Sequence, residues 1–321
     1  MIIAAVIIPL SAFLAMNMGA SGFSVSFTPS YGSNILKRNR AVLLYALCVL
    51  LGSVLVGPRV GDTLMKKITS YPLNLSSGII ILSSCAMTML LSNLLRVPQS
   101  TSFVTVASFV GAGFYHGDVH WLVILKIVFF ASFFSLSSFF LTILIKRKIY
   151  PPHQGNIRFY EKFFIHRAKF KKFIVLHDLY AGFAIGTNNV ANVVAPLVIS
   201  LAFHPLLAFL FISPLFGIGA LLFGEKMIQS VSKDIVPIGE FSASIVSLIT
   251  ATFVIIASLL GLPTPYVQFT TFSLIGISCI KDGFRCTMEK PIVKRFVSVW
   301  IIVPLFTAFS SYMLHLLFLN G

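Results

Sequence analysis

The sequence has little charge and especially few acidic residues. Of its 321 residues 10% are charged, and only nine are Asp or Glu, whereas about a quarter of the residues in a soluble domain are charged. The hydrophobic residues AVILMFWYC make up 57% of the chain, and 32 of them are Phe. So few polar groups cannot cover the surface of a water-soluble globule. The composition therefore excludes a soluble protein and predicts an integral membrane protein in a lipid bilayer.

Cysteine is also scarce, and its spacing excludes the usual metal sites. The four cysteines form no CxxC pair and have no neighbouring histidine pattern, so we interpret them as small apolar residues and expect no metal and no cofactor. The apolar segments also lack a nucleophile with a nearby base, which argues against an enzyme. The net charge of +15 lies in short loops without interleaved aromatics, so no nucleic-acid partner is expected.

Long apolar runs fill most of the chain. Each is close to the roughly 20 residues that a helix needs to cross a membrane. The first residues, MIIAAVIIPLSAFLAMNMGASG, have neither a basic start nor a cleavage site and predict a first membrane helix, not a signal peptide. The predicted fold class is an all-α multi-pass membrane bundle. The clearest runs are 41–57, 75–95, 120–145, 205–224 and 240–262.

Lys and Arg are concentrated in alternate loops. If the N-terminus is outside, the loops predicted inside hold 19 of the 24. The hydrophilic stretch 146–172 contains nine of them and divides the chain near its middle. The positive-inside rule places the linker 146–172 in the cytoplasm. It places both termini on the outer side of the cytoplasmic membrane. Binding of anionic lipid headgroups is a second role that this composition allows the linker.

The two halves of the chain match each other at a nearly constant offset. With the linker inside and both ends outside, each half crosses the membrane an odd number of times, so the repeats 1–145 and 173–321 are predicted to be inverted. Segments 75–115 and 236–280 are either pairs of full spans or re-entrant hairpins, and their Pro-bracketed tips favour hairpins. The matched pairs include Gly19 with Gly186, Gly52 with Gly219 and Pro98 with Pro263.

Four polar clusters interrupt the apolar spans, two in each half. Residues 17–26 match 186–192, and residues 98–102 match 263–268. Gly and Pro loosen a membrane helix, and the freed backbone groups must be met by neighbours or by a ligand. The start of a broken helix attracts an anion. For one such cluster alone, close helix packing is the favoured explanation, but four clusters in symmetric positions favour a substrate pathway.

At these clusters the sequence resembles a known family. GTNNVAN at 186–192, followed by APL at 195–197, resembles the duplicated GANDVAN…GP signature of the inorganic phosphate transporter family. PQSTS at 98–102 resembles that family's PxSTT hairpin tip. AMNMGASG at 15–22 and VWIIVP at 299–304 resemble the bacterial sulfate permeases of this family. The resemblance spans essentially the whole chain and implies cation-coupled ion transport, with substrate between the signature helices and the hairpin tips.

The sequence departs from the phosphate pattern at the signature carboxylates. Where the family has an Asn-Asp pair in each half, this chain has Ser21-Gly22 and Asn188-Asn189. Phosphate keeps a proton that donates to a carboxylate, whereas sulfate only accepts hydrogen bonds and would be repelled. Losing the acids also removes ligands for a hard cation. The predicted substrate-binding residues are Ser21, Gly22, Ser24, Gln99, Ser100, Thr101, Ser102, Asn188, Asn189, Asn192, Thr264 and Tyr266.

These features together predict a secondary transporter that imports sulfate, or a related oxyanion, by alternating access and proton symport. Asp178 and Glu240 are the acids nearest to predicted membrane segments and are candidates for carrying the proton, and a role at a helix start is the alternative for each. The rival predictions are an inorganic phosphate transporter of the same fold, proton- or sodium-coupled, and a membrane enzyme or scaffold. A homodimer is a family-level expectation.

Overall fold

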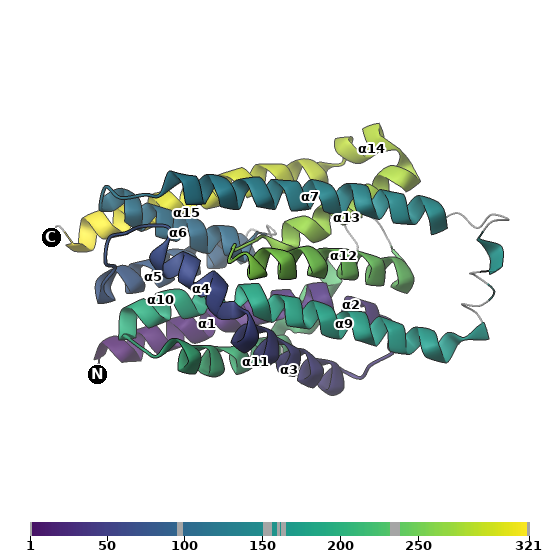
Figure 1. The fold of residues 1–321 in the computed structure, drawn as a ribbon, viewed down its shortest axis with the longest axis horizontal. Coiled ribbons are helices and arrows are strands. Elements are labelled where there is room, and N and C mark those ends of the chain that lie inside the picture. Colours follow the sequence, from purple (N-terminus) through teal and green to yellow (C-terminus); the bar gives the residue numbers. More distant parts are fainter. Residues whose placement is uncertain are drawn as a thin grey trace.

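A computed structural model describes residues 2–94, 99–149, 156–158, 161, 165–231 and 238–319. Within these ranges the chain is an elongated bundle of α-helices and contains no β-strand (Figure 1). Among the described residues, eight helical segments, counting Arg167–Leu201 as one, are long and apolar enough to cross a membrane. The predicted all-α, multi-pass membrane architecture is confirmed. Parts of the predicted linker, residues 150–155, 159–160 and 162–164, lie outside the described residues, and the proposed domain boundaries stay predictions.

The two halves have a similar order of helices. The first contains α1 (Ile2–Ser26), α2 (Thr28–Gly32), α3 (Arg38–Leu55), α4 (Gly57–Lys66), α5 (Leu75–Leu94), α6 (Thr101–Tyr115) and α7 (Trp121–Ile149). The second contains α9 (Arg167–Asn189), α10 (Ala191–Leu201), α11 (Pro205–Val231), α12 (Glu240–Leu259), α13 (Tyr266–Asp282), α14 (Phe284–Glu289) and α15 (Pro291–Leu319).

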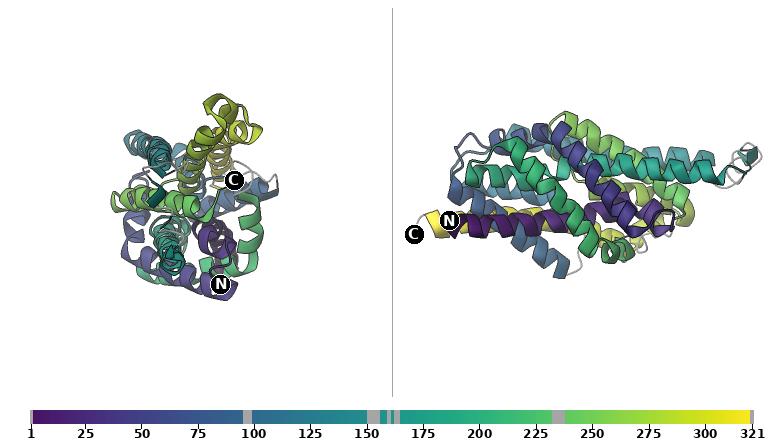
Figure 2. Two further views of the ribbon diagram at one scale, coloured as in Figure 1. Left: turned by 90° about the vertical axis from the view of Figure 1, so that its right-hand side faces the viewer. Right: turned by 90° about the horizontal axis from the view of Figure 1, so that it is seen from below.

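Both chain termini lie at one end of the bundle. The end of α7 and the start of α9 lie at the opposite end, here called the linker end (Figures 1 and 2). This placement is what an odd number of crossings in each half requires. Which end faces the cytoplasm stays a prediction.

Two helix pairs turn back inside the bundle. α5 and α6 enter from the end that holds the termini, α12 and α13 enter from the linker end, and the two turns lie near the middle (Figure 1). α6 has 15 residues and α13 has 17, so at 1.5 Å per residue they span about 22 and 26 Å. Both fall short of the roughly 30 Å of hydrocarbon in a bilayer. The geometry is that of re-entrant hairpins, although residues 95–98 and 236–237 lie outside the described residues.

Glycine allows α1 and α11 to cross at close range. A Cβ atom at Gly19 would lie 2.3 Å from the carbonyl oxygen of Phe216, and one at Gly219 would lie 2.0 Å from the carbonyl oxygen of Met16. Real Cβ contacts are essentially never this short, so the crossing requires glycine at both positions. Small residues at such contacts are the usual means of helix packing in membranes.

The crossing of α3 and α9 is built in the same way. A Cβ atom at Gly52 would lie 2.2 Å from the carbonyl oxygen of Phe183, and one at Gly186 would lie 2.2 Å from that of Val49. The sequence repeat matches each of these glycines with one glycine of the α1–α11 crossing. The inverted relation of the halves itself stays a prediction.

A helix break occurs at one signature cluster but not at the other. α9 and α10 meet at Val190, inside the second-half signature. α1 runs unbroken through the first polar cluster, and the chain leaves the helix only at Phe27. The expected break within the first cluster is therefore wrong. The cause is local, because the polar side chains bond back to the helix: Asn17 Nδ2 donates to the carbonyl of Phe13 (3.0 Å), and Ser26 donates to the carbonyl four residues earlier (2.7 Å).

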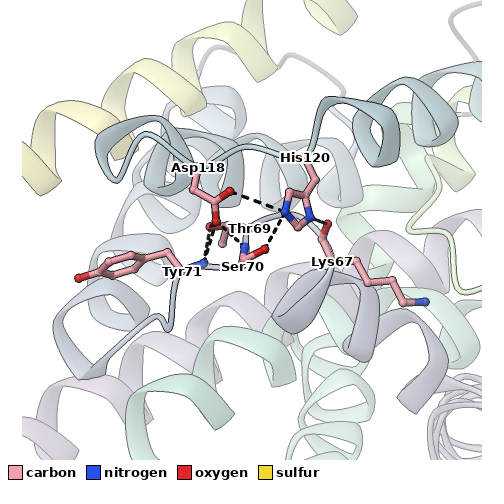
Figure 3. Close-up of polar contacts among 6 residues, drawn as sticks. All are labelled: Lys67, Thr69, Ser70, Tyr71, Asp118 and His120. Atoms are coloured by element: carbon pink, nitrogen blue, oxygen red, sulfur yellow. Dashed lines mark hydrogen bonds and ion pairs between the residues drawn. The ribbon is translucent and has the colours of Figure 1, made fainter.

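Asp118 ties together two loops at the end that holds the termini. Its Oδ2 accepts hydrogen bonds from the backbone N–H groups of Ser70 (2.6 Å) and Tyr71 (2.8 Å) and from the hydroxyl of Thr69 (3.1 Å) (Figure 3). His120 Nε2 lies 2.7 Å from Ser70 Oγ and 3.6 Å from Asp118 Oδ1. These contacts join the loop after α4 to the loop between α6 and α7, and so fix the outer end of the first hairpin.

We expect Asp118→Asn to lower the unfolding temperature at neutral pH and to have little effect in acid. Partial burial acts to raise the pKa of Asp118, but the hydrogen bonds from Thr69, Ser70 and Tyr71, with His120 nearby, outweigh it and hold the pKa below 3.8. A carboxyl with a lowered folded-state pKa stabilises the fold above its unfolded-state pKa, and this stabilisation is lost as the pH falls through the folded-state value. Thermal unfolding in detergent at pH 7 and at pH 3 measures the effect.

The control for this experiment is Asp62→Asn. Asp62 lies in α4, the helix that precedes the same loop, and within the described ranges its side chain pairs with Lys66 one turn away (2.8 Å) and with no other charged group; both side chains are exposed. Exposed pairs of this kind contribute little to stability, so we expect no measurable change. A destabilisation by Asp118→Asn of equal size at both pH values would contradict the role assigned to the carboxylate.

Candidate functional site

A small cavity, here called the central cavity, lies where the two hairpin tips meet α1 and α9. Every side chain in its lining is uncharged. Its volume, about 10 Å³ for the centre of a water molecule, is room for about one water. Six of the twelve predicted substrate-binding residues line it: Ser21, Gly22, Ser100, Thr101, Asn189 and Tyr266, together with Val25, Ile185 and Val267.

Two helices begin at the central cavity. α6 begins at Thr101 and α13 begins at Tyr266, and they approach from opposite ends of the bundle (Figure 1). Ser100 caps α6 by accepting a hydrogen bond from the backbone N–H of Phe103 (3.3 Å). A helix N-terminus carries unpaired N–H groups and about half a unit of positive charge. The cavity therefore has positive potential on two sides without any charged side chain.

Asn188 joins the two hairpin tips. Its Nδ2 donates to Ser258 Oγ of α12 (2.9 Å) and to the carbonyl of Leu262 in the turn that follows (3.0 Å). Its Oδ1 accepts from Ser102 Oγ of α6 (3.2 Å) and from the backbone N–H of Thr264 (3.0 Å). Every polar group of this side chain is thus engaged within the protein. An anion reaches the Asn188 amide only if these bonds open, so its role as a ligand stays a prediction.

The other predicted residues do not line the central cavity. Ser102 Oγ accepts a hydrogen bond from Asn192 Nδ2 (3.0 Å) and donates one to Asn188 Oδ1. Ser102 and Asn192 are therefore part of the hydrogen-bond network around Asn188. Ser24 donates to the carbonyl three residues earlier (2.8 Å) and faces a second cavity. Gln99 and Thr264 are buried. Among the described residues, no hydrogen-bond partner is found for Gln99 Oε1, Thr264 Oγ1 or Asn192 Oδ1.

Asn189 is the signature amide that faces the central cavity. The residue is only 6% exposed, and within the described part of the chain its Oδ1 has no hydrogen-bond partner. Buried polar atoms without partners are rare, and they commonly mark a place for a ligand or a water. Half a turn about the last side-chain bond exchanges the oxygen for the NH₂ group. Asn189 is therefore free to donate to an anion, in contrast to Asn188 next to it.

Sequence analysis missed Tyr45, which fills the space beside Gly22. A Cβ atom at Gly22 would lie 2.5 Å from Tyr45 Oη and 2.9 Å from Ile185 Cγ2. Tyr45 is fully buried, and its hydroxyl donates to the carbonyl of Gly19 (3.0 Å). Any side chain at position 22, including the carboxylate of the phosphate pattern, would therefore have to displace Tyr45 or Ile185. The only signal in the sequence was Gly22 itself, because the residue that packs on it comes from another helix.

The two candidate coupling acids lie in opposite environments. Glu240 is the first residue of α12 and is exposed. Asp178 of α9 is completely buried, with Oδ2 accepting from the backbone N–H of Ser30 (2.9 Å). Over the described ranges, Asp178 Oδ1 has no hydrogen-bond partner and no ion pair includes this residue. A carboxylate buried without a cation is very costly, and a bound proton removes that cost.

Comparison with known proteins places this chain and its fold among transporters of inorganic anions. Residues 18–311 match the phosphate transporter family. The chain is 33% identical over 317 residues to the sulfate permease CysP of Bacillus subtilis, covering 97% of this chain and 87% of the relative. It is 23% identical over 361 aligned positions to a putative phosphate permease of Helicobacter pylori, covering 85% and 68%. A solved structure of a sodium-dependent phosphate transporter matches all of both chains at 20% identity with a TM-score of 0.77, which shows a shared fold.

Proposed function

The chain belongs to the phosphate transporter family, and on this basis we propose that it imports sulfate across the cytoplasmic membrane by alternating access, driven by co-transported protons. Its general class is a multi-pass membrane transporter for an inorganic anion, not an enzyme. The choice of sulfate, the proton coupling and the direction are the proposal. The name of the Bacillus subtilis relative supports the choice of sulfate.

The neutral lining of the central cavity is the observation that carries the choice of sulfate. Sulfate is a full dianion and only accepts hydrogen bonds, so it needs donors and positive potential without a competing acid. The cavity offers the hydroxyls of Ser21, Ser100 and Thr101, the amide of Asn189 and two helix N-termini. Tyr45 occupies the space where a carboxylate at position 22 would stand.

The placement of the hairpins supports alternating access. Each hairpin reaches the central cavity from a different end of the bundle (Figure 1), so withdrawal of one hairpin opens the cavity to one end only. This geometry fits two inverted repeats with both termini outside. One chain supplies both hairpins and both signature helices, so the mechanism does not require the predicted homodimer.

Phosphate is the second candidate substrate, and one observation favours it. Gln99 Oε1, Asn189 Oδ1 and Asn192 Oδ1 are buried acceptors without partners among the described residues. Such oxygens suit the P–OH group of a phosphate that keeps a proton, or a cation that accompanies it. The Helicobacter relative is named a putative phosphate permease. Competition between anions separates the two candidates.

We expect Asn189→Ala to weaken sulfate binding at least roughly tenfold, because a hydrogen bond to a charged group contributes about 1.5–3 kcal/mol. The unfolding temperature without sulfate should change little, since the Asn189 Oδ1 atom has no partner within the described part of the chain. Equilibrium binding of radiolabelled sulfate to the purified protein in detergent measures the affinity. Thiosulfate, selenate and molybdate should compete with the label, and phosphate should compete weakly.

Asn74→Ala is the matched control. Asn74 is also an amide, but it caps the start of α5 by accepting from the N–H of Ser77 (3.0 Å) and does not line the cavity. Its replacement should leave the sulfate affinity unchanged. Unchanged affinity in Asn189→Ala would remove that residue from the site, and strong competition by phosphate would favour the second candidate.

A further inference from the structure

A second cavity lies on the linker-end side of the central cavity. It is bounded by α1, α2, α12 and α13. Its volume is about 40 Å³, whereas that of the central cavity is about 10 Å³. Its lining includes four hydroxyl residues, Ser24, Thr28, Ser247 and Thr270, and is otherwise apolar. No charged residue is among the residues that line it.

The second cavity continues the central cavity along two helices. On α1, Ser21 and Gly22 line the central cavity, and Ser24 lines the second. On α13, Tyr266 lines the central cavity, and Thr270, one turn later, lines the second. Both helices run from the middle of the bundle toward the linker end over these residues (Figure 1). The two cavities are therefore consecutive positions on one line toward that end.

Tyr266 and Val25 stand between the two cavities. Val25 belongs to both linings. Tyr266 is 3% exposed, lines the central cavity, and its hydroxyl accepts from Thr250 Oγ1 of α12 at 3.4 Å. Ser247, three residues before Thr250 on the same helix, lines the second cavity, and its Oγ has no hydrogen-bond partner within the described ranges. The Tyr266 side chain thus extends from one cavity to the wall of the other.

We propose that the second cavity is the passage through which the anion moves between the central cavity and the linker end, and that Tyr266 and Val25 form its closed gate. The proposal rests on the central cavity being the transport site. The Ser247 hydroxyl, which has no hydrogen-bond partner among the described residues, offers an anion a weak contact on its way, and the lining has no charge that would hold the anion. Breaking the 3.4 Å hydrogen bond from Thr250 to Tyr266 frees the ring to turn aside when the α12–α13 hairpin moves.

One wall of this passage is tied to the buried acid of α9. Thr28 and Pro29 of α2 line the second cavity, and the N–H of Ser30, the next residue, is bound by Asp178. Tyr266 of α13 lies within electrostatic reach of Asp178, and the buried His177 is its neighbour on α9. A proton on Asp178 therefore changes the charge beside the passage wall and beside the gate.

Cysteine labelling tests the gate. In a background with Cys48, Cys279 and Cys286 replaced by Ser, one variant carries Ser21→Cys in the central cavity and another carries Thr270→Cys in the passage. A small anionic methanethiosulfonate is added to membrane vesicles of each orientation. With Tyr266 in place, we expect the cysteine at position 270 to react roughly tenfold faster than that at position 21 from the linker-end side. Adding Tyr266→Ala should raise the rate at position 21 to that at position 270.

Phe269→Ala is the matched control, because Phe269 is a fully buried ring on the same helix that lines neither cavity. It should leave the rate at position 21 unchanged. Equal rates at the two positions with Tyr266 in place, or equal acceleration by Phe269→Ala, would overturn the gate. The comparison of labelling rates at positions 21 and 270 keeps Tyr266 unchanged. It therefore tests the gate even if Tyr266→Ala fails to fold. Labelling does not depend on which anion is carried, so a failure of the sulfate proposal leaves these rates unchanged.

Discussion

Replacing Asn188 by Ala is expected to abolish sulfate uptake and to destabilise the protein by roughly 3 kcal/mol or more, because buried groups that lose their hydrogen-bond partner each cost about 1–3 kcal/mol. The side chain makes four hydrogen bonds, which hold Ser102 of one hairpin tip and Ser258, Leu262 and Thr264 of the other. Without them, both tips lose the contact that sets their distance across the central cavity. Thermal unfolding in detergent and uptake into proteoliposomes measure the two effects.

Asn189→Ala is the control for this experiment, since the two amides are neighbours of the same type. It should lose sulfate affinity and keep a nearly normal unfolding temperature. Equal destabilisation by the two replacements would show that the loss of any amide here loosens the bundle. An Asn188→Ala variant with normal stability and normal uptake would contradict the role of Asn188 in joining the hairpins.

Replacing Asp178 by Asn is expected to abolish the accumulation of sulfate that a proton gradient drives. Asn has nearly the same shape and keeps an acceptor for the N–H of Ser30 (2.9 Å from Asp178 in the wild type), but it neither binds nor releases a proton. An ionisable group inside a membrane segment is a functional candidate by default, and this one is completely buried. We expect concentrative uptake to fall at least roughly tenfold, while exchange of external for internal sulfate continues.

Glu240→Gln separates a general need for acids from a specific role of Asp178. Glu240 is the other candidate from the sequence, but it is exposed at the start of α12, so we expect its replacement to leave coupling unchanged. Proton-driven accumulation by Asp178→Asn at the wild-type level would exclude Asp178 as the proton carrier. Loss of coupling in Glu240→Gln alone would assign the proton to Glu240.

The sequence predicts the architecture well because its signals are local. Lengths of apolar runs give the membrane segments, and Pro and polar residues at 263–268 give the turn of a hairpin. The break between α9 and α10 follows from the run of small and polar residues at 186–192. The same argument fails for α1, because Asn17 and Ser26 satisfy their polar groups within the helix. Composition alone does not distinguish a polar cluster that breaks a helix from one that bonds back to it.

The candidate site is only half predictable because it depends on contacts between distant segments. Asn188 and Asn189 are adjacent, but successive side chains on a helix point about 100° apart, so one meets the hairpin tips and the other the cavity. Which one does so depends on how α9 packs. Tyr45 beside Gly22 is a similar case, since the two residues come from different helices.

The most direct test of the central claim is uptake of radiolabelled sulfate into proteoliposomes that contain the purified wild-type protein. Uptake is compared under an inward proton gradient, an inward sodium gradient and no gradient, each with and without excess unlabelled phosphate. We predict that the proton gradient alone drives accumulation and that phosphate does not suppress it. Accumulation that requires sodium, or that phosphate suppresses, would contradict the account and identify a phosphate transporter that works without the signature carboxylates.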